Sequence, residues 1–127
     1  MWKSFASALL IGAVFAAPAA DVMGNLPDAP EFQTAMYSGY LTVSATKSLH
    51  YVFAESFNSP ATDPVIIWFN GGPGCSSMLG FMQENGPIAI DDGVSFIISN
   101  PYPWNLKANV LWIESPAGVG YSIAGTP

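Results

Sequence analysis

A run of five apolar residues at positions 65–69 ends abruptly in the segment N-G-G-P-G at 70–74. A continuous apolar run of this length is typical of a strand that is buried on both faces. Three glycines within four residues raise the entropic cost of folding, which is tolerated where the backbone needs unusual angles or must approach a ligand closely. The pattern therefore predicts a buried strand that carries a glycine-rich loop at its end.

This loop has the composition of an anion-binding segment. Backbone N–H groups at the end of a strand can converge on an anion, as in an oxyanion hole or a carboxylate nest. The side-chain amide of Asn70 adds a donor for a carboxylate oxygen. A purely structural turn would use the same residues, so the glycines alone leave both interpretations open. A phosphate-binding P-loop is excluded because no Gly-Lys-Ser/Thr follows.

The remaining segments indicate a mixture of strands and one short helix. We expect an antiparallel hairpin, a helix that begins at Ser76 or Ser77 and ends near Glu84, a short strand and then a second buried strand. In order, these segments are 36–43 with 49–55, 76–84, 94–98 and 110–113. A second glycine-rich loop follows at 114–120. The fold class predicted is α/β, with a mixed sheet and an antiparallel hairpin at its edge.

Charge and composition narrow the possible partners. The chain has 127 residues, with 3 Lys and Arg against 9 Asp and Glu, and a net charge of −6. It has no basic run that could follow phosphates, so we predict no nucleic-acid binding. Half of the residues are hydrophobic and 9% are charged, a high apolar content for a short domain. This composition favours a chain that packs against more protein.

The first residues have the three-part layout of a secretory signal peptide. Lys3 is followed by an apolar run at 5–15 and by small residues at 16–20. We predict a signal peptide over 1–16, with cleavage as late as residue 19, and a folded region from 21 to 127. A membrane anchor is the alternative, but the run is too short for a helix across about 30 Å of hydrocarbon. No membrane association is expected after cleavage.

The loop lies within a longer motif that resembles a known family. The segment W-F-N-G-G-P-G-C-S-S at 68–77 resembles the signature W-x-N-G-G-P-G-C-S-S of serine carboxypeptidases. Four further segments resemble family motifs in the same order, with Pro103 where the family usually has serine. They are Y-S-G-Y-L at 37–41, E-N-G-P at 84–87, N-P-Y-P-W-N at 100–105 and P-A-G-V-G-Y-S at 116–122. The resemblance implies the amino-terminal part of an α/β-hydrolase fold and the removal of single residues from the carboxyl end of peptides.

The resemblance also implies roles for individual residues. Asn70 and Gly71 match positions that hold the terminal carboxylate of the peptide, and the N–H of Gly72 matches part of the oxyanion hole. Trp68 is included with this substrate-binding set, as a wall of the pocket. Glu84 matches a carboxyl that shares a hydrogen bond with a second glutamate, a pairing that works best in acid.

Four other candidate residues lie outside this substrate-binding set. Cys75 is the only cysteine, so it is a free thiol, an intermolecular partner or half of a disulfide whose second cysteine is not in this sequence. The resemblance implies the disulfide. We interpret Ser76 and Ser77 as helix-cap and packing residues. His50 is interpreted as structural, since nothing in the sequence places a serine and an acid beside it. With one histidine and one cysteine, we predict no metal site and no cofactor.

The family's nucleophile segment G-E-S-Y-[AG]-G and the later Asp and His that match its triad are not found in these 127 residues. Acyl-enzyme hydrolysis needs a nucleophile, a base and a group that orients the base. We therefore expect this polypeptide alone to lack peptidase activity. The favoured hypothesis is part of a secreted carboxypeptidase of the lysosome, vacuole or extracellular space. The alternatives are a non-catalytic carboxylate-binding or interaction module, and part of a related acyltransferase.

Overall fold

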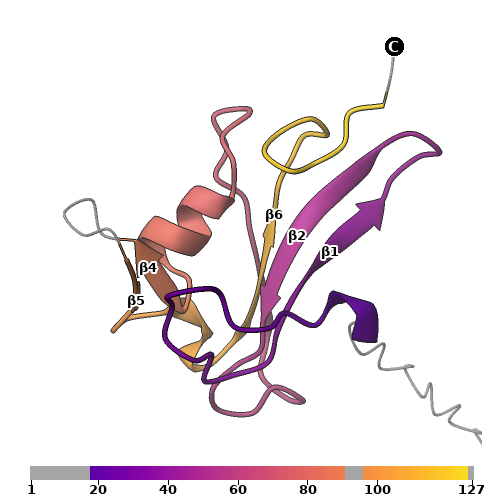
Figure 1. Ribbon diagram of the computed structural model, residues 1–127. Helices are drawn as coiled ribbons and strands as arrows, with labels where there is room; N and C mark the ends of the chain where they lie inside the picture. Colours follow the sequence, from indigo (N-terminus) through magenta and orange to yellow (C-terminus); the bar gives the residue numbers. More distant parts are fainter. Residues whose placement is uncertain (1–17, 91–95, 126–127) are drawn as a thin grey trace, which may run out of the picture.

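The computed structural model describes residues 18–90 and 96–125, and the predicted signal peptide lies outside these ranges. The main sheet has four strands in the order β1-β2-β6-β3. These strands are β1 (Met36–Thr42), β2 (Ser48–Ala54), β6 (Asn109–Ile113) and β3 (Val65–Trp68). β1, β2 and β6 pair antiparallel, whereas β3 runs parallel to β6. The sheet is therefore mixed, and the predicted α/β class with an antiparallel edge is confirmed (Figure 1).

The predicted hairpin forms with nearly the expected bounds. Met36 lies opposite Ala54 at one end of the β1–β2 ladder, and Thr42 lies opposite Ser48 at the other. Aromatic and branched residues dominate both strands, as expected for side chains that pack on a pleated surface. Figure 1 shows this hairpin as the outer part of the sheet, with β6 beside β2 on the side away from β1.

The prediction that residues 65–69 are buried on both faces is wrong. Ile66 and Trp68 pack against the core, whereas Val65 is 60% exposed, and Ile67 and Phe69 are each 54% exposed. Alternate side chains of a strand point to opposite faces, and only one face of β3 is covered by other described residues. β6 does match its prediction, because both of its neighbours are strands and four of its five residues are buried.

The core lies between the sheet and a short helical segment that begins near Met78. Its last part, η2 (Gly80–Glu84), has π-type hydrogen bonding, with the N–H of Asn85 donating to the carbonyl of Gly80 at 2.8 Å. Phe81 contacts Trp112 edge-on with ring centroids 5.2 Å apart. The buried core cluster consists of Met36, Val52, Ala54, Phe81, Ile88, Val110 and Trp112. Figure 1 shows the helix beside β6, where this packing occurs.

Smaller elements complete the described fold. β4 (Ile88–Ile90) was not predicted and pairs antiparallel with β5 (Ile97–Ser99). The strand predicted at 94–98 therefore begins later, and residues 94 and 95 lie outside the described ranges. Two short 3₁₀ helices, η1 (Ala19–Asp21) and η3 (Trp104–Leu106), flank the sheet. Within residues 18–90 and 96–125, no helix is long and apolar enough to cross a membrane.

Candidate functional site

The glycine-rich loop leaves the end of β3 as a tight turn. The N–H of Cys75 donates to the carbonyl of Gly71 at 3.0 Å, which closes the turn. Gly71 and Gly72 have φ angles of 75° and 109°, in a region that residues with a Cβ rarely adopt. Among the described residues, neither of their N–H groups has a hydrogen-bond acceptor. Both groups are therefore available to an anion.

The side chain of Asn70 links this loop to the helix. Its Oδ1 accepts hydrogen bonds from Trp68 Nε1 at 2.8 Å and from the N–H of Gly80 at 3.1 Å. These two bonds orient the amide so that Nδ2 donates to Glu84 Oε1 at 3.2 Å. Trp68 is held in turn by an edge-on contact with Trp104, with centroids 5.2 Å apart. The structure thus brings together Trp68, Asn70 and Glu84, three of the predicted site residues.

Two consecutive serines attach the loop to the end of β6. Ser77 is 1% exposed, and its hydroxyl donates to the carbonyl of Ile113 at 2.6 Å and accepts from the N–H of Asn70 at 3.3 Å. The hydroxyl of Ser76 donates to Glu114 Oε1 and accepts from the N–H of Met78 at 3.2 Å. The helical segment begins directly after the two serines, and the contact of Ser76 Oγ with the N–H of Met78 is of the kind that a helix-capping hydroxyl makes. Their other contacts fix the loop against the sheet.

Cys75 is exposed and has a free thiol. The thiol lies close to the loop backbone, since a Cβ added at Gly72 would be 2.9 Å from Cys75 Sγ. The disulfide implied by the family resemblance stays a prediction.

The expectation that no serine and acid lie beside His50 is wrong. His50 Nε2 is 2.9 Å from Ser38 Oγ, and His50 Nδ1 is 3.0 Å from Glu114 Oε2. The acid is 64 positions away in the sequence, so only the β2–β6 pairing brings the two side chains together. One sequence signal pointed to Glu114: an acidic residue directly after a buried strand and before a glycine-rich loop.

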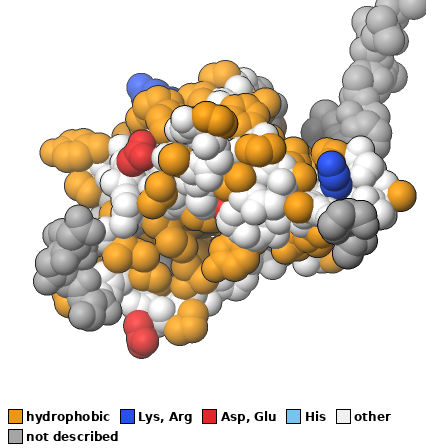
Figure 2. Space-filling model, turned by 90° about the horizontal axis from the view of Figure 1, so that it is seen from above, with side chains coloured by type: hydrophobic (Ala, Val, Ile, Leu, Met, Phe, Trp, Pro, Cys, Tyr) orange, Lys and Arg blue, Asp and Glu red, His pale blue; other side chains and the backbone are white. Residues whose placement is uncertain are grey.

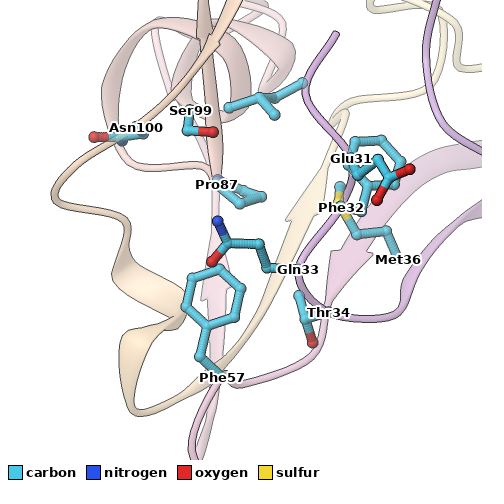
Figure 3. Close-up of a pocket in the computed structure, with 10 residues that line it drawn as sticks. Glu31, Phe32, Gln33, Thr34, Met36, Phe57, Pro87, Ser99 and Asn100 are labelled. Atoms are coloured by element: carbon cyan, nitrogen blue, oxygen red, sulfur yellow. The ribbon is translucent and has the colours of Figure 1, made fainter.

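A small cavity lies away from this loop, between the residues that precede β1 and the β4–β5 pair. Figure 3 shows Phe32, Met36 and Phe57 at its wall, with Asn100 on the opposite side. Its volume is about 40 Å³, room for only a few water molecules. None of the predicted site residues lines it. The described residues also hold no group of three His, Cys, Asp or Glu side chains that could bind a metal ion.

Comparisons with known proteins find members of one enzyme family. The profile of the serine carboxypeptidase family matches residues 27–127. Lysosomal protective protein of Mus musculus is 54% identical over 103 residues, which are 80% of this chain and 21% of that protein. A serine carboxypeptidase of Caenorhabditis elegans is 50% identical over 110 residues, which are 84% of this chain and 23% of that protein.

A solved structure agrees as well. A prohormone-processing carboxypeptidase from Saccharomyces cerevisiae matches with a TM-score of 0.60 and 29% identity, over 69% of this chain and 20% of that one. This chain thus spans about a fifth of the length of the relatives it matches. The matched fold is part of an α/β-hydrolase sheet, and the matched family segment contains the whole of the loop described above. The chain belongs to the serine carboxypeptidase family.

Proposed function

We propose that this chain supplies the loop that binds the carboxyl end of a peptide in a serine-type carboxypeptidase. The observation that carries the proposal is the pair of free N–H groups at Gly71 and Gly72, next to the oriented amide of Asn70. Neutral donors that converge at a turn can bind a carboxylate without a cationic side chain. This suits a chain with a net charge of −6 and few cations.

Each site residue has a distinct role in this proposal. Asn70 Nδ2 and the N–H of Gly71 donate to the terminal carboxylate, while Trp68 forms a wall beside it. The N–H of Gly72 stabilises the oxyanion that develops when the last peptide bond is attacked. Glu84 lies 3.2 Å from Asn70 Nδ2, so a bound carboxylate would be its close neighbour. Two neighbouring carboxylates repel each other unless a proton lies between them, so Glu84 is expected to influence how tightly the terminal carboxylate binds.

We further propose that residues 1–127 bind peptides without hydrolysing them. They contain no G-x-S-x-G segment, and both ring nitrogens of the single histidine, His50, lie within hydrogen-bond distance of other side chains. A fluorophosphonate probe should leave the chain unlabelled. Stoichiometric labelling would contradict this part of the proposal.

The exposed apolar side chains support a second element of the proposal, that this chain packs against further protein of the same fold. Val65 and Ile67 on one face of β3, and Phe69 directly after the strand, are each more than half exposed. On the face seen from above, many hydrophobic side chains reach the surface among uncharged polar groups, with only a few isolated charges (Figure 2). Such surfaces usually mark contacts with protein. The exposed Cys75 would then find its disulfide partner in the same protein, within the secretory pathway and its lysosomal, vacuolar or extracellular destinations.

The test is a comparison of two peptides that differ only at the carboxyl end. The chain is titrated with an N-acetyl dipeptide as the free acid and as the amide. The free acid should bind about tenfold more tightly, the equivalent of one charge-assisted hydrogen bond. Replacing Asn70 by alanine should remove most of this preference. The matched control is Asn58→Ala, because the Asn58 amide also donates to a carboxylate, that of Asp63, but before β3 begins. Equal affinity for both peptides would contradict the proposal.

A further inference from the structure

We propose that Glu114 is a positioning residue that orients the glycine-rich loop through Ser76, an inference that rests on the proposed function. Glu114 follows β6 directly and is fully buried, with 0% exposure. A buried carboxylate is tolerated only when hydrogen-bond donors surround it. Its partners here come from three different segments of the chain.

Both carboxylate oxygens of Glu114 are occupied. Oε1 accepts the hydroxyl of Ser76, at the end of the glycine-rich loop. Oε2 accepts the N–H of Tyr121 at 2.7 Å and lies 3.0 Å from His50 Nδ1. One side chain therefore joins the loop at 71–77, the loop at 118–122 and strand β2.

The loop at 118–122 is shaped around this carboxylate. A Cβ on Gly120 would overlap the side chain of Glu114, and Gly120 also has a φ of 52°. Ser122 adds a second link, since its hydroxyl donates to the carbonyl of Glu114 at 2.7 Å and accepts from the N–H of His50 at 2.8 Å. The position of Glu114 is thus fixed independently of the glycine-rich loop.

His50 fixes Glu114 from the other side. The His50 ring makes edge-type contacts with the rings of Tyr40 and Tyr121, with centroids 5.6 Å and 5.3 Å away, and its Nε2 contacts Ser38. The distances resemble those of a serine–histidine–acid triad, but His50 is only 8% exposed and Ser38 lies in the middle of β1. A nucleophile must reach its substrate, so this array is suited to holding Glu114 and not to attacking a peptide.

The glycine-rich loop is attached to the end of β6 through two side chains, those of Ser77 and Ser76. Ser77 fixes the N–H of Asn70 and is anchored to the carbonyl of Ile113. Ser76 is anchored one residue further along, to the side chain of Glu114. Without the second anchor, the turn that contains Gly72 could rotate about the first. The direction of the Gly72 N–H therefore depends on Glu114.

The experiment compares Ser76→Ala with a matched control, Ser56→Ala. Both changes remove a hydroxyl that donates to a carboxylate, but Ser56 donates to Asp63 before β3, far along the strand from the loop. Two quantities are measured: the ratio of amide to free-acid peptide dissociation constants, and the ¹H–¹⁵N signals of Gly71 and Gly72 without peptide. Ser76→Ala should lower the ratio of dissociation constants about tenfold, which corresponds to the loss of one charge-assisted hydrogen bond. It should also shift the signals of Gly71 and Gly72. Ser56→Ala should change neither quantity, although Ser56 is the more buried serine.

Glu114→Gln is a conservative variant that should keep the contacts that orient the loop. Its amide oxygen can still accept from Tyr121 and His50, while its NH₂ can donate to the hydroxyl of Ser76. The peptide ratio should therefore stay within about threefold of the wild-type value. Unshifted Gly71 and Gly72 signals in Ser76→Ala would overturn the positioning role, whatever the peptides do. A wild-type chain without any peptide preference would overturn the proposed function instead, and the signal comparison alone would then decide the positioning role.

Discussion

Replacing Ser77 by alanine should destabilise the chain by about 2–3 kcal/mol. The change removes a hydroxyl that is 1% exposed and makes two hydrogen bonds, to the carbonyl of Ile113 at 2.6 Å and from the N–H of Asn70 at 3.3 Å. Leaving a buried polar group without its partner costs about 1–3 kcal/mol, whereas a partly exposed group can recruit water and costs less. Ile113 is 8% exposed and Asn70 is only half-buried, so most of the loss comes from the carbonyl of Ile113.

The assay is urea denaturation followed by tryptophan fluorescence. Trp68 lies next to this loop, and Trp112 reports on the core. The denaturation midpoint should fall while the slope of free energy against urea stays the same, because the change in exposed area on unfolding is unaltered. Ser59→Ala, in the turn before β3, is the control, and it should change the free energy of unfolding by less than about 0.5 kcal/mol. A Ser77→Ala variant as stable as this control would refute the reasoning that the serine anchors the loop.

Three further predictions concern other parts of the fold. Burial and the carboxylate of Asp21 raise the pKa of Tyr51 to about 12, so the folded state should lose stability as pH rises from about 10 to about 12. In chemical denaturation measured across this pH range, Tyr51→Phe should reduce the fall in the free energy of unfolding. Asn109→Ala should cost about 3 kcal/mol in the same denaturation assay, because its amide makes three hydrogen bonds to the 56–63 turn and is 4% exposed. Ile67→Lys, on the exposed face of the edge strand, should reduce self-association in light scattering and leave stability within about 0.5 kcal/mol.

Local patterns predicted most of the strands. The hairpin and both apolar runs carry their signal in consecutive residues, so the strands at 36–42, 48–54 and 109–113 agree with expectation within a few positions. β4 was missed because its three residues are too few to show a period. The burial of β3 was misjudged because an apolar run does not reveal how many layers cover it. That depends on the neighbours of the strand in three dimensions.

The site was predictable only in part. Glycine spacing indicated the loop, and the family resemblance singled out Asn70 and Glu84, whose hydrogen bond spans 14 positions. Neither indicated that Glu114 would meet His50 and Ser76, since those contacts depend on the register of β2 against β6 and on the path of the loop. Long-range polar contacts of this kind are set by tertiary packing and leave little trace in local composition.

The most direct test of the central claim is to locate the bound carboxylate on the loop. A ¹H–¹⁵N spectrum of the labelled chain is recorded while the N-acetyl dipeptide acid is added, and again with the amide. The account predicts that the largest shifts from the acid fall on the N–H groups of Gly71 and Gly72 and on the side-chain amide of Asn70, and that the amide peptide at the same concentration shifts these signals less. Shifts that avoid these three residues, or that are the same for both peptides, would contradict it.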